Sequence, residues 1–227
     1  MKALRWSLGV VGDLLVTAGL VLLLFVAWQL WWTDVTANRV QDQTIARLDR
    51  EFSRPAPASA NEKPKAVPFG EAFAILRIPR LGADYARPVL EGTSLDILDE
   101  GVGHYKDTAL PGVVGNFAVA GHRTTYGRPF HDIDKLQPGD KVVVETKTTY
   151  FVYVVRSHKI VLPTAVEVIA PVPDKPGAKP TERWMTMTAC HPKYSAAQRY
   201  IVFAQLEKSY PRAKGLPAGT LAVPKGA

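Results

Sequence analysis

The segment WMTMTACHPKYSAAQRYIVFAQL, residues 184–206, carries the strongest fold signal in this chain. Two mainly apolar runs, 184–190 and 200–206, flank a polar stretch that contains Pro and Ser. This pattern predicts two β-strands joined by a loop. If the strands pair as antiparallel neighbours, the reversal of the chain brings Arg199 back beside Cys190, nine residues before it.

From Phe69 onward, short apolar or β-branched runs alternate with Gly, Pro and Asp. Further candidate strands cover 73–78, 87–91, 116–121, 141–146, 150–160 and 166–170. Together with the first two, these eight short strands predict an all-β fold, a closed barrel. A Ser cap and a helical apolar spacing predict a short helix at 94–100, and the Pro-rich stretch 171–180 is expected to be a loop.

The N-terminal region predicts a single membrane-spanning helix. The run from Leu14 to Trp32 has no charged residue and, with the apolar residues before it, can cross roughly 30 Å of hydrocarbon. Lys2 and Arg5 precede the run and the next positive residue is Arg39, so we expect the N-terminus in the cytoplasm and the rest outside. The alternative is a cleaved signal peptide, but the apolar run is long for one and no small-x-small cleavage site follows it.

The composition divides the chain into four predicted parts. They are a cytoplasmic tip and transmembrane anchor at 1–33, a helical and Pro-rich linker at 34–68, the β-barrel at 69–210 and a tail at 211–227. The formal net charge is +7, but Lys and Arg are scattered rather than clustered with aromatic residues. We therefore expect no nucleic-acid partner, whereas an anionic envelope surface fits the charge.

Three side chains stand out for their chemistry. The chain has one cysteine, Cys190, which excludes an internal disulfide, and an unpaired thiol in an exported domain is either buried or used. Cys190 closes one predicted strand, and His122 occupies the same position at the end of another. Arg199 would supply a permanent cation near the thiol, although a surface position on its strand is the alternative.

These residues lie in motifs that resemble the sortase signature. The motifs are AGHR at 120–123, TMTAC at 186–190 and Arg199 nine residues after the cysteine. The more familiar cysteine motif is T-L-x-T-C, so Met187 stands in place of Leu and Ala189 in place of Thr. The stretches GHRTTYGRPF and CHPKYSAAQRYIV are most similar to the class E sortases of actinobacteria.

The resemblance implies an eight-stranded sortase β-barrel and a cysteine transpeptidase. Its sulfur, here Cys190, would cleave a sorting signal of the L-P-x-T-G type, with Ala favoured over Pro in class E, and form a thioester. His122 would move protons, and Arg199 would orient the substrate and stabilise the oxyanion. The implied partners are secreted proteins with C-terminal sorting signals and an amine of a peptidoglycan precursor, and the chemistry requires no cofactor or metal.

Three further residues are candidates for substrate binding. Tyr126 lies just after His122, and its hydroxyl could distinguish an Ala-containing signal, which keeps a backbone N–H, from a Pro-containing one. The alternative for Tyr126 is an ordinary exposed aromatic. Thr188 and Ala120, which lie close to Cys190 and His122 in the motifs, complete the predicted set.

Two other functions fit parts of the sequence. An L,D-transpeptidase also uses Cys and His on an exported β-rich domain, but its usual S-H-G-C neighbourhood is absent. A membrane-anchored binding module with an inactive sortase-like barrel is the second. A calcium site built from Asp132, Asp134 and Asp140 is disfavoured, because their spacing matches no known calcium loop and suits turns and caps.

Overall fold

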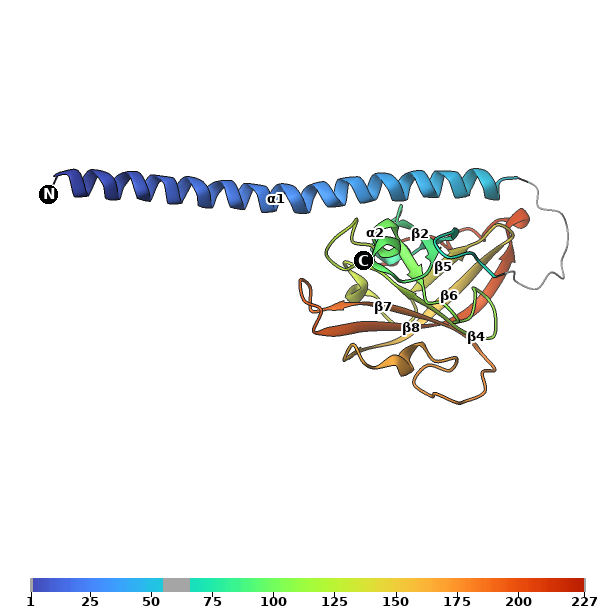
Figure 1. Ribbon diagram of the computed structural model, residues 1–227. Coiled ribbons are helices and arrows are strands. Elements are labelled where there is room, and N and C mark those ends of the chain that lie inside the picture. Colours follow the sequence, from blue (N-terminus) through green and yellow to red (C-terminus); the bar gives the residue numbers. More distant parts are fainter. Residues whose placement is uncertain (1, 55–65, 227) are drawn as a thin grey trace.

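The computed structural model describes residues 2–54 and 66–226. It consists of one long N-terminal helix and a β-barrel (Figure 1). Eight strands form the barrel: β1 Ala72–Arg77, β2 Ala86–Glu91, β3 Val102–His104, β4 Gly115–Ala120, β5 Lys141–Glu145, β6 Thr149–Val161, β7 Arg183–His191 and β8 Gln198–Pro211. Their order around the closed barrel is β1-β2-β3-β4-β7-β8-β6-β5, which confirms the predicted fold class.

The pairing is antiparallel except at two places, where β2 runs parallel to β3 and β4 runs parallel to β7. The antiparallel pair of β7 and β8 is the one expected from the sequence of residues 184–206. Apolar side chains fill the barrel and are fully buried, among them Phe117, Tyr153 and Met187. Since strand residues alternate between two faces, every second residue of β7 is left to face outward.

The predicted and observed elements differ at two places. Residues 166–170 were expected to form a strand, but Val166–Ile169 form a 3₁₀ helix, η3. Its Val168 packs against Ile201 and Phe203 on the outside of β8. Val168 is the buried residue of this segment, and a helical turn can bury one side chain without a strand partner. The third strand, β3, was not predicted. It has only three residues, one of them Gly103, so it shows no alternation of apolar and polar residues that would indicate a strand.

The helices outside the barrel are short apart from the first. The predicted helix at 94–100 is confirmed as α2, Leu95–Glu100. Besides η3, there are three further 3₁₀ helices in the described residues: η1 Pro79–Leu81, η2 Ile133–Lys135 and η4 Arg212–Lys214. The predicted loop at 171–180 contains no helix or strand.

The first helix, α1 Lys2–Phe52, is continuous for 51 residues. Its N-terminal part projects away from the barrel and its C-terminal part lies along it (Figure 1). The described residues contain one helix that is long and apolar enough to cross a membrane, and its apolar window is fully exposed in the isolated chain. The apolar run expected to span the membrane therefore lies in the projecting part.

One face of the C-terminal part of α1 is buried against the barrel. The buried residues Ala37, Gln41, Leu48 and Phe52 recur at helical spacing, and the last two pack in a cluster with Ile75 of β1. The predicted boundary at residue 33 therefore falls within a continuous helix. Most of the Pro-rich stretch, 55–65, lies outside the described residues, and the division into four parts stays a prediction.

Candidate active site

The register of the sheet brings the three predicted catalytic residues together. Cys190 on β7 is directly opposite Arg199 on β8. On the other side of β7, the parallel pairing of β4 aligns Ala120 with Thr188, and the Gly121 amide donates to the Thr188 carbonyl over 3.1 Å. His122 comes two residues after Ala120, as Cys190 comes two residues after Thr188, so His122 follows the end of β4 that lies beside the Cys190 end of β7.

Alternation along β7 decides which way the thiol faces. Met185, Met187 and Ala189 point into the barrel core. Thr186, Thr188 and Cys190 share the other face, so the thiol lies on the outside of the barrel wall. Cys190 is partly exposed and unpaired. A rigid strand therefore presents the sulfur to solvent, which a nucleophile requires.

The imidazole of His122 contacts two side chains. Its Nε2 lies 2.9 Å from Oδ1 of Asp99, the penultimate residue of α2. The ring of Tyr126 lies 5.3 Å from the imidazole ring, measured between centroids. Asp99 was not among the predicted site residues, because its 23-residue separation from His122 is bridged only by the packing of α2.

Arg199 is held by its own loop. Its Nη1 donates to the carbonyls of Ala196 and Gln198, each over 2.9 Å. These bonds keep the guanidinium at the start of β8, beside Cys190.

A groove of about 120 Å³ extends from Arg199 along the outer face of β7 and β8. Its floor includes Thr188 and Ile201, which pair across the two strands. Its wall comes from the segment that joins β6 to η3 and from η3 itself. The full lining is Tyr105, Val161, Leu162, Pro163, Ala165, Val166, Val168, Ile169, Thr188, Arg199 and Ile201. Most of these residues are apolar, so the groove suits an apolar side chain next to a polar backbone.

Comparison with known proteins identifies the family. A sortase domain model matches residues 76–207. The chain belongs to the sortase family. Sortase SrtE1 of Streptomyces coelicolor is 40% identical over 215 residues, which are 91% of this chain and 59% of that protein. The chain therefore spans about three fifths of the length of that relative.

Solved sortase structures show the same fold. Sortase E from Streptomyces avermitilis is 46% identical with a TM-score of 0.62, covering 68% of this chain and 99% of that one. Sortase E1 from Streptomyces coelicolor, solved with a tripeptide in its active site, is 42% identical with a TM-score of 0.61 and covers 67% of this chain and 98% of its own. The predicted likeness to class E sortases is thus confirmed, and an L,D-transpeptidase is set aside.

A second arginine of this sortase, Arg123, ties the histidine segment to the cysteine strand. It is 3% exposed and follows His122 directly. Its Nη1 lies 3.3 Å from the Cys190 carbonyl and 2.8 Å from Nδ1 of His191, and its Nη2 pairs with Asp134 at 2.9 Å. Arg123 is part of the AGHR motif but was not among the predicted site residues, although it stands next to His122 in the sequence.

The predicted substrate-binding residues of the sortase fall in different places. Thr188 lines the groove, and its hydroxyl lies 3.0 Å from that of Tyr105. Ala120 is 8% exposed and lies beside Thr188, outside the groove lining. Tyr126 is also outside that lining; its backbone has a positive φ of 52°, and its ring packs against the imidazole of His122.

The three aspartates once considered for calcium each pair with a cation. Asp132 binds Lys135 and Lys193, with 3.1 Å between the atoms in both pairs. Burial alone would raise the pKa of the Asp132 carboxyl, but the two lysines outweigh it and lower the pKa. Asp134 pairs with Arg123 as described, and both oxygens of Asp140 accept from Arg80, at 2.5 and 2.7 Å.

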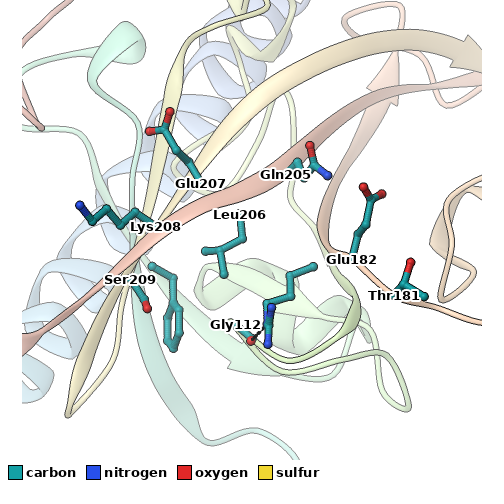
Figure 2. A pocket seen from close by; sticks show the side chains of 10 residues that line it. Gly112, Thr181, Glu182, Gln205, Leu206, Glu207, Lys208 and Ser209 are labelled. Carbon is teal, nitrogen blue, oxygen red and sulfur yellow. Dashed lines mark hydrogen bonds between the residues drawn. The ribbon is translucent and has the colours of Figure 1, made fainter.

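A larger hollow of about 550 Å³ lies at the other end of β7 and β8 (Figure 2). Arg183, the first residue of β7, donates there to the Gly112 carbonyl over 2.8 Å. Seven residues of strand separate Arg183 from Cys190, roughly 23 Å at strand spacing. The described residues that line this hollow include no His or Cys. Size alone therefore does not mark the catalytic site of this sortase.

Proposed function

We propose that the chain is a membrane-anchored sortase transpeptidase with Cys190, His122 and Arg199 as its catalytic residues. The proposal is supported chiefly by the register that places Cys190 opposite Arg199 and brings the end of β4, which His122 follows, beside β7. A lone, partly exposed thiol on a rigid strand, beside an imidazole and a guanidinium, has the parts needed for acyl transfer.

The first half of the reaction forms the acyl-enzyme. With the proton of its thiol held by His122, the Cys190 thiolate attacks the carbonyl carbon of the Thr–Gly peptide bond, and the carbonyl oxygen becomes an oxyanion beside Arg199. As the tetrahedral intermediate collapses, the C–N bond breaks and the leaving amine takes a proton from His122. The products are a thioester on Cys190 and the released C-terminal fragment.

The second half transfers the acyl group. An amine of a peptidoglycan precursor attacks the thioester carbonyl and gives its proton to His122. The C–S bond then breaks, and the Cys190 sulfur leaves with the bonding electrons. A secreted protein is thereby joined to the acceptor through a new amide bond, and the enzyme returns to its starting state.

The substrate is a sorting signal of the L-P-x-T-G type, most suitably with Ala at the second position. The apolar groove that ends at Arg199 has the right lining for the leucine of such a signal. The solved sortase E1 of Streptomyces coelicolor holds a tripeptide in its active site, which supports a peptide substrate for this chain. Thr188 in the groove, and Ala120 and Tyr126 near His122, contact the substrate in this proposal.

The chain crosses the membrane once, with its N-terminus in the cytoplasm and the barrel outside. The exposed apolar side chains of α1 and its position at the N-terminal side of the barrel support this arrangement. Secreted proteins that carry a sorting signal and cell-wall precursors are both on that side of the membrane.

Mass spectrometry of the full-length protein tests the enzyme against a mere binding module. After incubation with a sorting pentapeptide, we expect a mass increase on Cys190 that equals the acyl fragment and disappears with hydroxylamine. Cys190→Ala is the control and should gain nothing. A wild-type protein that binds the peptide but never gains mass would show that the barrel is a binding module.

Tyr126 is tested by comparing acyl transfer from an Ala-containing and a Pro-containing pentapeptide. If its hydroxyl recognises the N–H of the Ala-containing signal, Tyr126→Phe should lower the preference for that signal several-fold, as expected for one lost hydrogen bond. Thermal unfolding should be unchanged, because the phenol is not part of the core. An unaltered preference would show that the Tyr126 hydroxyl does not recognise the sorting signal.

A further inference from the structure

We propose that Asp99 is a positioning residue that orients His122 and selects the imidazole nitrogen that moves protons. The inference rests on the proposed function, and it adds a residue from α2 to the site. Asp99 touches neither sulfur nor substrate in this account. It acts through the imidazole.

The position of Asp99 is set by packing on both sides of it. Within α2, Ile97 is 6% exposed and packs in the cluster beneath α1. After α2, a Cβ added to Gly101 would lie 2.7 Å from the Pro88 carbonyl oxygen, so the helix end sits directly against β2. The chain then enters β3, whose Gly103 pairs with Ala120 of β4. Because β3 follows α2 directly and pairs with β4, the end of α2 lies near the end of β4, which His122 follows.

The chemistry of the contact fixes the imidazole tautomer. An ionised carboxylate can only accept a hydrogen bond, so the 2.9 Å contact with Asp99 requires a proton on Nε2 of His122. In the neutral ring the lone pair is then on Nδ1. That nitrogen is left to accept a proton from the attacking amine and, in the charged ring, to deliver one to the leaving amine. The carboxylate thus has the role that the aspartate has in a Ser-His-Asp triad.

Exposure argues for a role in orientation rather than stability. The side chains of His122 and Asp99 are 18% and 33% exposed, and solvent screens such a pair. The pair therefore adds little to the stability of the fold. It does, however, fix the orientation of the imidazole that transfers protons in the proposed mechanism. Tyr126, whose ring lies at 30° to the imidazole, limits the ring from a second direction.

The first test is kinetic, on the full-length protein in detergent micelles with a sorting pentapeptide and an amine acceptor. We expect Asp99→Ala to lower kcat about tenfold or more with KM within about twofold of wild type, since general acid–base catalysis contributes at least that factor. Asp99→Asn, whose amide oxygen can still accept from Nε2, should recover part of the rate. Glu100→Ala, an exposed neighbour on α2, is the matched control and should leave kcat unchanged.

The second test does not depend on turnover. Nitrogen NMR of histidine-labelled protein at alkaline pH, where imidazole rings are neutral, reports which ring nitrogen carries the proton. Wild type and Glu100→Ala should show His122 with the proton on Nε2, and Asp99→Ala should show a mixture. If Asp99→Ala lowers expression, Asp99→Leu, which also has no side-chain acceptor, serves for both measurements.

The outcomes separate this inference from the proposed function. An unchanged kcat, or a His122 tautomer that is the same with and without the Asp99 carboxylate, overturns the role of Asp99 even if Cys190 forms a thioester. If wild type forms no thioester, the proposed function fails and the positioning of a catalytic base fails with it. The NMR spectra would then still show whether the Asp99–His122 hydrogen bond exists.

Discussion

At the scale of single residues, two arginines of the site differ in what their charge does. Arg199 is bound by carbonyls of its own loop and lines the groove, whereas Arg123 is almost completely buried and does not line the groove. The Arg123 guanidinium also lies 5.5 Å from the centre of the Tyr200 ring. Since arginine only donates, its contact with His191 requires an unprotonated Nδ1 on that ring. Arg123 thus holds the end of β7, at Cys190 and His191, in one arrangement.

Replacing Arg123 should therefore affect both stability and acyl transfer. Arg123→Met keeps much of the length but no donors, so the Cys190 carbonyl and the His191 ring lose their partner. We expect the free energy of unfolding to fall by about 1–3 kcal/mol, and the rate of thioester formation to fall as well. Arg123→Lys should be only partly better, because one ammonium cannot reproduce the fork of bonds.

Urea unfolding and the rate of mass gain on Cys190 measure the two effects. Arg156→Met is the control. Arg156 is exposed on β6 and binds Gln205 of β8, which pairs with Trp184 at the end of β7 away from Cys190. Wild-type acylation in Arg123→Met would show that the buried guanidinium serves the fold alone.

At the scale of elements, α1 carries the apolar run and also contacts the loop after β4. Asp34 accepts from the Gly127 amide over 3.0 Å and pairs with Arg128 at 2.8 Å. Gln41 donates to the Tyr126 carbonyl over 3.1 Å. Gly127 has φ of +73°, and an added Cβ would meet the side chains of Asn38 and Gln41 at 2.8 and 2.9 Å. The helix and the loop therefore approach as closely as a glycine allows.

Loosening this contact should make the loop that begins at His122 more mobile. In Asp34→Ala, the Gly127 amide loses its acceptor, so hydrogen exchange across residues 122–128 should become faster while the barrel strands keep their protection. The rate of acyl transfer should fall about two- to tenfold, which corresponds to one lost hydrogen bond. Asp42→Ala, an exposed aspartate on the same helix, should change neither. Equal exchange in wild type and Asp34→Ala would mean that α1 does not support the loop.

At the scale of the whole molecule, stability comes from a closed barrel whose interior holds few polar atoms. Tyr153 is a fully buried exception, and its hydroxyl accepts from the Gly112 amide over 2.8 Å. Burial raises the pKa of the Tyr153 phenol well above its ordinary value, because the charged form would have to lie in the core. The unfolded chain has no such constraint, and there the phenol ionises near pH 10.

This difference predicts a loss of stability at high pH. A raised pKa in the folded state means that the stabilisation is complete below the unfolded pKa and is lost as the pH rises toward the folded value. Above about pH 10, Tyr153 should contribute a fall of up to about 1.4 kcal/mol per pH unit in the free energy of unfolding. Tyr153→Phe should be less stable at neutral pH but should lose less on alkalinisation. Urea unfolding from about pH 9 to 11.5 measures the slope, with the exposed Tyr194→Phe as control.

Local patterns in the sequence determined seven of the eight strands, the apolar span and the three candidate catalytic residues. Alternation and turn residues define strands without knowledge of their partners, and a strand end marks where a side chain can be both held and exposed. Cys190 and Arg199 could be paired in advance because only nine residues of chain separate them. The hydrophobicity of the run from Leu14 to Trp32 is likewise a local property.

Only the tertiary structure decided which distant residues support those three. The contact of Asp99 with His122 depends on where α2 packs, and the burial of Arg123 depends on the approach of η2 and β8. The docking of α1 on the loop at Gly127 depends on a close approach between segments about 90 residues apart. The third strand and η3 were misjudged for the same reason. Short elements take their form from the surfaces they cover, and these surfaces exist only after the chain has folded.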